Sequence, residues 1–196
     1  AGNIVAGPLS DRFGRKKVLL ITAMLFTISA IWSATATTYI TFVIARIIGG
    51  IGIGGAILIA PIYIAEVAPP KLRGSLVSLN QLNIVIGISV AYFSNYFLKD
   101  LEGESWRWML GVEAFPAIFY FLALFIVPRS PRWLIQRLNL VDAARSILIK
   151  IGGQDYAQLT IEEIQRGIAK KESKGTLSDL FTYRMQTIMV IAFSKA

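Results

Sequence analysis

The stretch FVIARIIGGIGIGGAILIAPIYIAE, residues 42–66, decides the fold of this 196-residue chain. A helix needs about 20 apolar residues to cross the hydrocarbon core of a bilayer, and this stretch is long enough to do so within a predicted span over residues 39–65. Similar apolar runs predict three further spans, over residues 18–36, 75–97 and 108–127. The sequence therefore predicts an all-α membrane protein.

The two ends of the chain resemble incomplete spans. Residues 1–10 are apolar, but ten residues rise only about 15 Å as a helix, which is half of the hydrocarbon core. Residues 185–196 begin a further apolar run and stop after about two turns. We therefore predict a bundle over residues 1–127, a linker over 128–184 and the start of another span over 185–196, as in a fragment of a longer protein.

The basic residues orient the predicted spans. Sixteen of the 20 Lys and Arg residues lie in the loop over residues 11–17, the turn over residues 68–74 and the linker over residues 128–184. Only Lys99 and Arg107 lie in the loops on the opposite side. Loops rich in Lys and Arg stay in the cytoplasm, so the linker is predicted to be cytoplasmic.

Composition excludes several classes of protein. The chain has no Cys and no His, which removes zinc and thiol chemistry, and no cluster of acid, base and nucleophile indicates an enzyme. The net charge of +8 does not indicate a nucleic-acid partner, because basic and aromatic residues do not interleave as base stacking requires. We expect neither a metal nor a cofactor.

The linker is predicted to contain two amphipathic helices. Residues 141–151 and 160–171 each place apolar side chains at helical spacing, and glycines 152–153 separate them. Thr160 and Glu163 form a capping box that would open the second helix. These helices would dock on the protein or on lipid headgroups, and their acidic residues favour the protein.

The opening stretch contains glycines and one charge that need an explanation. Gly50 and Gly54 form a G-x-x-x-G motif with Gly52 between them, and such small residues let two membrane helices approach closely. Arg46 lies within the same span. A charge inside a span requires a cavity or a counter-ion.

Glu113 is the predicted counter-ion. Arg46 lies seven residues inward from Tyr39, and Glu113 lies seven residues inward from Trp106. Both aromatic residues are expected at the outer membrane surface, so the two charges lie at the same depth of ~10 Å. We predict an ion pair between Arg46 and Glu113; the alternative is that each side chain extends separately to the outer headgroups.

Five motifs in order resemble the sugar porter branch of the major facilitator superfamily. The resemblance runs from the end of the family's second helix to the beginning of its seventh, which implies helices 3 to 6 and cytoplasmic helices in between. The motifs are GPLSDRFGRKK (7–17), RIIGGIGIG (46–54), PIYIAEVAPPKLRG (61–74), NQLNIVIGI (80–88) and PRSPRWL (128–134).

The resemblance implies a gating latch on the cytoplasmic side. Asp11 and Arg15 would help to hold the cytoplasmic gate closed in the outward-facing state, and Glu66 and Arg73 would belong to the same latch. The alternative is that the charges serve membrane topology alone. Arg12 and Arg132 complete the predicted set.

One residue departs from the family pattern within PRSPRWL. Arg129 stands where the family usually has Glu, although Ser130, Pro131, Arg132 and Trp133 match. The substitution reverses a charge in the predicted latch, so the sequence does not decide whether the latch residues have the family's usual ion-pair partners.

The resemblance also implies a sugar-binding face. Gln81, Ile84 and Ile88 are spaced to share one face of a helix, and a carboxamide suits sugar hydroxyls. The alternative for Gln81 is a hydrogen bond that joins two helices. In similar proton-coupled porters an Arg at the position of Arg46 neighbours a Glu at that of Glu113, and uniporters often lack the Glu.

The sequence thus predicts transport of a monosaccharide by alternating access, coupled to protons, with the fragment inactive alone. The expected partners are the sugar, protons, the lipid bilayer and a carboxy-terminal half of the same transporter. The expected location is the plasma (inner) membrane. The alternatives are a non-transporting sugar sensor or truncated partner, and a polyol transporter.

Overall fold

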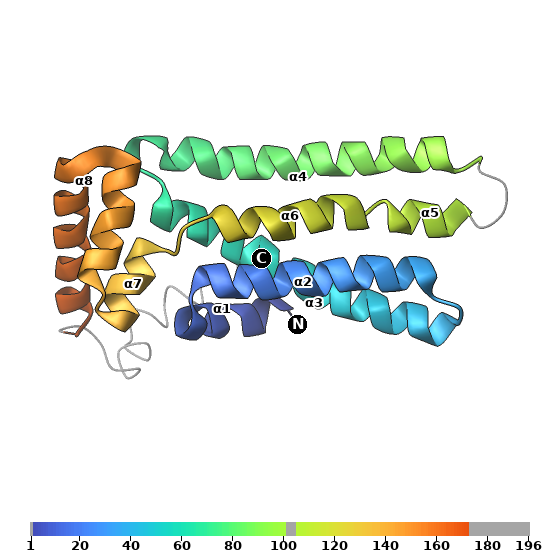
Figure 1. Ribbon diagram of the computed structural model, residues 1–196, viewed down its shortest axis with the longest axis horizontal. Helices are drawn as coiled ribbons and strands as arrows, with labels where there is room; N and C mark the ends of the chain where they lie inside the picture. Colours follow the sequence, from blue (N-terminus) through green and yellow to red (C-terminus); the bar gives the residue numbers. More distant parts are fainter. Residues whose placement is uncertain (1, 101–104, 173–196) are drawn as a thin grey trace, which may run out of the picture.

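The computed structural model describes residues 2–100 and 105–172, which form helices joined by short connections (Figure 1). The predicted span start over residues 185–196 and the end of the predicted linker lie outside these described residues. In chain order the helices are α1 (Gly2–Phe13), α2 (Arg15–Thr35), α3 (Tyr39–Val67), α4 (Pro70–Leu98), α5 (Ser105–Gly111), α6 (Ala114–Ile126), α7 (Pro131–Leu138) and α8 (Val141–Glu172).

The four predicted spans are confirmed as helices long and apolar enough to cross a membrane. They are α2, α3, α4 and the pair formed by α5 and α6. In Figure 1 these spans run along one common axis, and α7 and α8 lie together at one end of the bundle. α1 is shorter and packs against α3.

The last span is broken, which the prediction of one helix over residues 108–127 missed. α5 ends at Gly111 and α6 begins at Ala114. The cause is Pro116, which has no N–H to bond the carbonyl of Val112 and whose ring crowds that carbonyl. The Val112 oxygen instead accepts a bond from Phe115 N at 3.2 Å. The break leaves Glu113 at a turn between two helices.

Glycines of α3 bring α2 and α3 close together. Gly49, Gly52 and Gly55 are buried, and a Cβ on Gly52 would lie 2.9 Å from the backbone oxygen of Thr22. The predicted close approach is confirmed at Gly52 and wrong at Gly50, where a Cβ would have nothing within 4 Å. Successive residues point about 100° apart around a helix axis. The glycines that face α2 are therefore Gly49, Gly52 and Gly55, and the series starts one residue before Gly50.

Two buried clusters divide the molecule. The larger lies between α1, α2, α3 and α6, and the smaller lies between α7 and α8. The larger contains Ala6, Val18, Leu19, Ala23, Ile59, Tyr63 and Leu124. The smaller contains Trp133, Leu134, Ile135, Ala144, Leu148, Ala157 and Ile161.

The helices of the linker predicted to be cytoplasmic, α7 and α8, dock on the rest of the protein. The indole N–H of Trp133 on α7 donates to the carbonyl of Asp11 at 3.1 Å, and α8 packs on α7. α8 bends at Gly153, whose φ of 85° is not helical, so two helical arms are present as predicted. The predicted capping box was wrong, because the second arm begins soon after Gly153 and Thr160 lies inside it.

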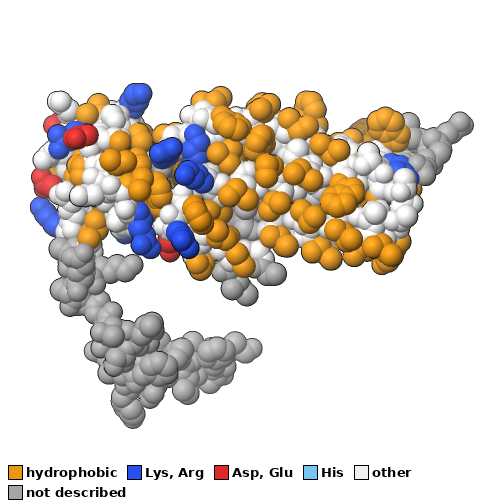
Figure 2. Space-filling view, turned by 60° about the horizontal axis from the view of Figure 1, so that its bottom comes forward, with side chains coloured by type: hydrophobic (Ala, Val, Ile, Leu, Met, Phe, Trp, Pro, Cys, Tyr) orange, Lys and Arg blue, Asp and Glu red, His pale blue; other side chains and the backbone are white. Residues whose placement is uncertain are grey.

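α4 lies at the edge of the bundle. None of its residues is buried, although it contacts α3 and α5. Its side chains are apolar for most of its length, as expected of a helix that contacts lipid or another helix. Figure 2 shows the wide apolar surface of the spans and a band of Lys and Arg where the spans meet the cytoplasmic helices.

Candidate functional site

The charged pair predicted within the spans is present in the structure. Arg46 Nη1 lies 3.2 Å from Glu113 Oε2, which is an ion pair and a hydrogen bond. Arg46 comes from the second turn of α3, and Glu113 comes from the break between α5 and α6. The side chains are 43% and 37% exposed, so the pair is open to a partner or solvent on one side.

Aromatic residues mark the outer end of the same helices. The rings of Phe42 and Trp106 meet edge to face with their centroids 6.2 Å apart. Phe42 lies four residues outward from Arg46, and Trp106 lies seven residues outward from Glu113. Tyr39 is 81% exposed at the first residue of α3. Aromatic residues of this kind are typical of the membrane–water interface. Arg46 and Glu113 therefore contact each other within the span rather than extending separately to the surface.

A second charged cluster joins α1, α2 and α3 at the end that is predicted to be cytoplasmic. Arg15 Nη2 lies 2.9 Å from an oxygen of Asp11 and 3.0 Å from an oxygen of Glu66. The side chains of Arg15 and Glu66 are only 12% and 8% exposed. Charges removed from water need such partners, so this pair fixes the start of α2 against the end of α3.

Ser130 extends this cluster to the cytoplasmic helices. Its hydroxyl donates to Glu66 Oε2 at 2.6 Å and accepts a bond from Trp133 N at 3.2 Å. Ser130 is 1% exposed. Sequence reasoning gave Ser130 no role, but a Ser directly before Pro131 is a typical N-terminal cap of a helix. That signal could have identified it.

Tyr63 makes a further connection between α3 and the α6–α7 segment. Its hydroxyl donates to the carbonyl of Pro128 at 2.7 Å. Together, the bonds of Tyr63 and Ser130 hold the residues after α6 against the cytoplasmic end of α3. A movement of α3 would therefore be transmitted to α7.

The other predicted latch residues lie nearby without joining the cluster. Arg73 is exposed and forms no ion pair with another described residue, and Glu66 pairs with Arg15 instead. The guanidinium of Arg12 lies 5.6 Å from the ring centroid of Phe13. Arg132 lines a pocket of about 500 Å³ that also exposes Asp11 and Glu66.

The predicted sugar-binding residues lie on α4. Gln81, Ile84 and Ile88 are all exposed. Gln81 forms no hydrogen bond with any other residue that the structure describes, so the alternative of a bond between two helices has no partner within these residues. In the same part of the chain, no three His, Cys, Asp or Glu side chains form a group that could hold a metal ion.

The comparisons with known proteins agree on one family. Residues 1–195 match the family described as "Sugar (and other) transporter". The chain is 42% identical over 193 residues to the arabinose-proton symporter of Bacillus subtilis. It is 39% identical over 191 residues to the D-xylose-proton symporter of Escherichia coli.

A solved structure gives the same result for the fold. The chain is similar to the major facilitator proton:xylose symporter XylE bound to 6-bromo-6-deoxy-D-glucose, with a TM-score of 0.82 and 37% identity. The similarity covers 89% of this chain and 42% of that one. The chain spans 41% of the arabinose symporter and 39% of the E. coli xylose symporter. The predicted fold, part of a major facilitator, is thereby confirmed.

Proposed function

The chain belongs to the sugar transporter family of the major facilitator superfamily, and we propose that the whole protein moves a monosaccharide across a membrane together with protons. It is an integral membrane protein with several spans. In this proposal residues 1–196 supply the amino-terminal part, which does not transport alone. Sugar-binding sites in such transporters lie between two halves near the bilayer midplane.

The Arg46–Glu113 pair carries the proposal of proton coupling. Ionisable residues within spans are typical of proton pathways, and the Glu113 carboxylate lies 3.2 Å from the Arg46 guanidinium. Protonation of Glu113 would weaken the pair and release Arg46. Because α3 and the α5–α6 break supply the two partners, this release would change how these helices contact each other.

The cytoplasmic cluster supplies the gate. Contacts shift a conformational equilibrium only if they form in one state and break in another. The bonds from Glu66 to Arg15 and to Ser130 would hold the cytoplasmic end closed while the outer side is open. Asp11, Arg12, Arg73 and Arg132 would extend this latch to the second half of the transporter.

The exposed face of α4 supplies part of the sugar site. Gln81 would bind sugar hydroxyls, and Ile84 and Ile88 would contact the apolar face of the sugar ring. The relatives named as arabinose and xylose symporters favour a sugar over another small solute. We place the protein in the plasma (inner) membrane, with the linker over residues 128–184 in the cytoplasm.

Proton uptake by proteoliposomes that contain the whole protein tests this proposal. Addition of D-xylose, L-arabinose or D-glucose outside is expected to drive proton entry together with labelled sugar. Sugar movement without protons would make the protein a facilitator. Polyol movement alone would assign a different substrate, and no movement with retained sugar binding would make it a sensor.

A further inference from the structure

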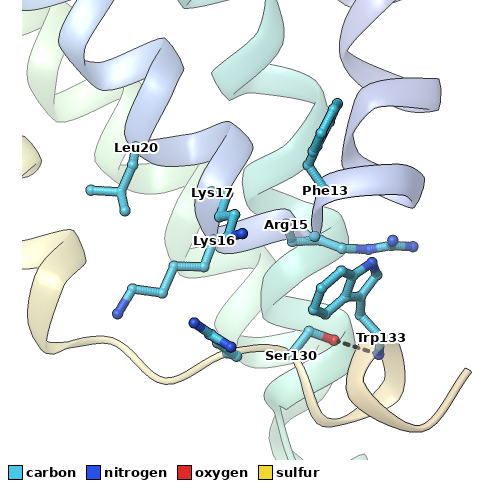
Figure 3. A pocket seen from close by; sticks show the side chains of 9 residues that line it. Phe13, Arg15, Lys16, Lys17, Leu20, Ser130 and Trp133 are labelled. Atoms are coloured by element: carbon cyan, nitrogen blue, oxygen red, sulfur yellow. Dashed lines mark hydrogen bonds between the residues drawn. The ribbon is translucent and has the colours of Figure 1, made fainter. Parts of the chain in front are cut away.

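A basic pocket lies where the start of α2 meets the connection between α6 and α7 (Figure 3). Its volume is about 210 Å³. Figure 3 shows Lys16 extending from the first turn of α2 toward this connection, with Trp133 at the opposite side. The lining residues are Phe13, Gly14, Arg15, Lys16, Lys17, Leu20, Arg129, Ser130 and Trp133.

The pocket has an excess of positive charge. Four of its lining residues are Lys or Arg, and none is Asp or Glu. Asp11 and Glu66 neutralise Arg15, but Lys16 donates to the neutral carbonyl of Phe125 at 2.9 Å. Lys17 and Arg129 form no ion pair within the described residues. Three cations thus converge on one pocket without a carboxylate.

Arg129 creates much of this excess. The sugar porter pattern has Glu at this position, and a Glu beside Lys16 and Lys17 would reduce the excess from three positive charges to one. Arg129 is exposed, so its guanidinium is available to a ligand. The N-terminus of α2 adds to the effect, since no side chain caps it and the positive end of a helix dipole favours an anion.

The frame of the pocket is held in place by contacts described above. Gly14, with a φ of 91°, lies directly under the Trp133 ring, and a Cβ on it would come within 3.1 Å of that ring. Trp133 is anchored through its indole N–H to the Asp11 carbonyl, and Ser130 is anchored to Glu66. The basic side chains therefore surround a pre-formed space.

We propose that this pocket binds the headgroup phosphate of an anionic phospholipid from the cytoplasmic leaflet. A lipid fits better than a free phosphate because Phe13 and Leu20 give the pocket an apolar wall. Leu20 is one turn from Lys16 on the same face of a membrane span, which would let an acyl chain follow α2. The band of basic residues in Figure 2 places the headgroup at the membrane surface.

The proposal predicts how strongly lipid binding depends on Arg129. One basic residue near an anionic surface changes binding about fivefold, which equals about 1 kcal/mol at 1.4 kcal/mol per tenfold. Arg129→Gln should weaken binding about fivefold. Arg129→Glu should weaken it roughly 25-fold, because it also introduces a repulsion of similar size.

Titration of the whole protein in neutral detergent with phosphatidylglycerol, followed by native mass spectrometry, tests the site. Phosphatidylcholine and inorganic phosphate serve as comparison ligands, and Lys71→Gln is the matched variant. Lys71 is exposed on the first turn of α4 and does not line the pocket. Saturable phosphatidylglycerol binding that Arg129→Gln weakens and Lys71→Gln retains would support the proposal.

Three outcomes would overturn it. Equal weakening by Lys71→Gln would indicate general attraction to the basic face. Unchanged binding in Arg129→Glu would exclude this pocket. Inorganic phosphate that binds as tightly as phosphatidylglycerol would make the ligand a free anion. The readout is lipid binding, so these outcomes do not depend on whether the protein transports sugar.

Discussion

Glu113 lies at the break between α5 and α6, and from there its carboxylate reaches Arg46 on α3 with 3.2 Å between Oε2 and Nη1. A proline three residues further along the chain causes this break. The carboxylate therefore lies at the break in the span, next to the guanidinium of Arg46. This geometry is the basis of the first prediction.

Glu113→Gln should abolish the dependence of sugar uptake on protons while the protein still folds. The amide keeps the shape of the side chain but takes up no proton. Linked binding events are typically coupled by about 1–3 kcal/mol, or 5–150-fold, and this coupling should be lost. Sugar-driven proton entry into proteoliposomes is the measurement, with sugar exchange at equal internal and external pH as the check on folding.

Glu163→Gln is the matched control for that experiment. Glu163 lies on the exposed surface of α8, far along the chain from the spans, and its neutralisation should leave uptake unchanged. If Glu113→Gln kept full proton entry, the coupling role of the pair would be wrong and the pair would be structural.

Gln81→Ala should weaken sugar binding by about two- to twelvefold. A hydrogen bond contributes about 0.5–1.5 kcal/mol net, and each 1.4 kcal/mol is tenfold in affinity. Asn83→Ala is the control, because Asn83 is two positions along α4 and points about 200° away from Gln81. Equilibrium binding of labelled sugar to the purified protein decides the matter: equal affinities for both variants would remove Gln81 from the site.

Arg15→Gln and Glu66→Gln should each destabilise the protein. The double variant should lose less stability than the sum of the two single losses. A buried ion that loses its partner costs up to about 3–5 kcal/mol, and the loss should be smaller for Glu66→Gln, because Arg15 keeps Asp11. Removal of both charges leaves no buried ion without a partner. Thermal unfolding in detergent measures this double-mutant cycle. The exposed pair of Arg166 and Glu162, with side chains 80% and 42% exposed, should show a coupling below about 1 kcal/mol.

A coupling between Arg15 and Glu66 no larger than that of the exposed pair would mean that the cluster adds nothing to the stability of the end where α1, α2 and α3 meet. A large coupling would show that the cluster stabilises the folded protein. Cysteine accessibility on the cytoplasmic side would then test whether loss of Glu66 also opens the gate.

Gly52→Ala should destabilise the protein by about 1–3 kcal/mol, because the added methyl group meets the backbone of α2 and an overpacked core must shift. Gly50→Ala should be neutral or slightly stabilising, since space is open there and Ala favours a helix by about 1 kcal/mol. Unfolding temperatures of the two variants test the assignment. Equal losses would mean that the close contact is not at Gly52.

Pattern alone predicted much of this protein. The four spans follow from the length of apolar runs, because a bilayer imposes that length, and the position of basic loops predicts their orientation. The meeting of Arg46 and Glu113 also follows from equal depth, since spans are nearly parallel and depth is fixed by residue count. The depth of a residue in a membrane can be counted from the sequence, because each residue of a helix rises by about 1.5 Å.

The tertiary structure decided which side of each helix faces its neighbour. It also decided which of several charged residues form ion pairs. Gly49 and Gly52, rather than Gly50, face α2, because successive residues of a helix point about 100° apart around its axis. Glu66 had Arg15 and Arg73 as candidate partners, and only packing of α2 against α3 brings Arg15 within 3.0 Å. The basic pocket around Arg129 likewise required α2 and the α6–α7 connection to meet, which no spacing along the chain specifies.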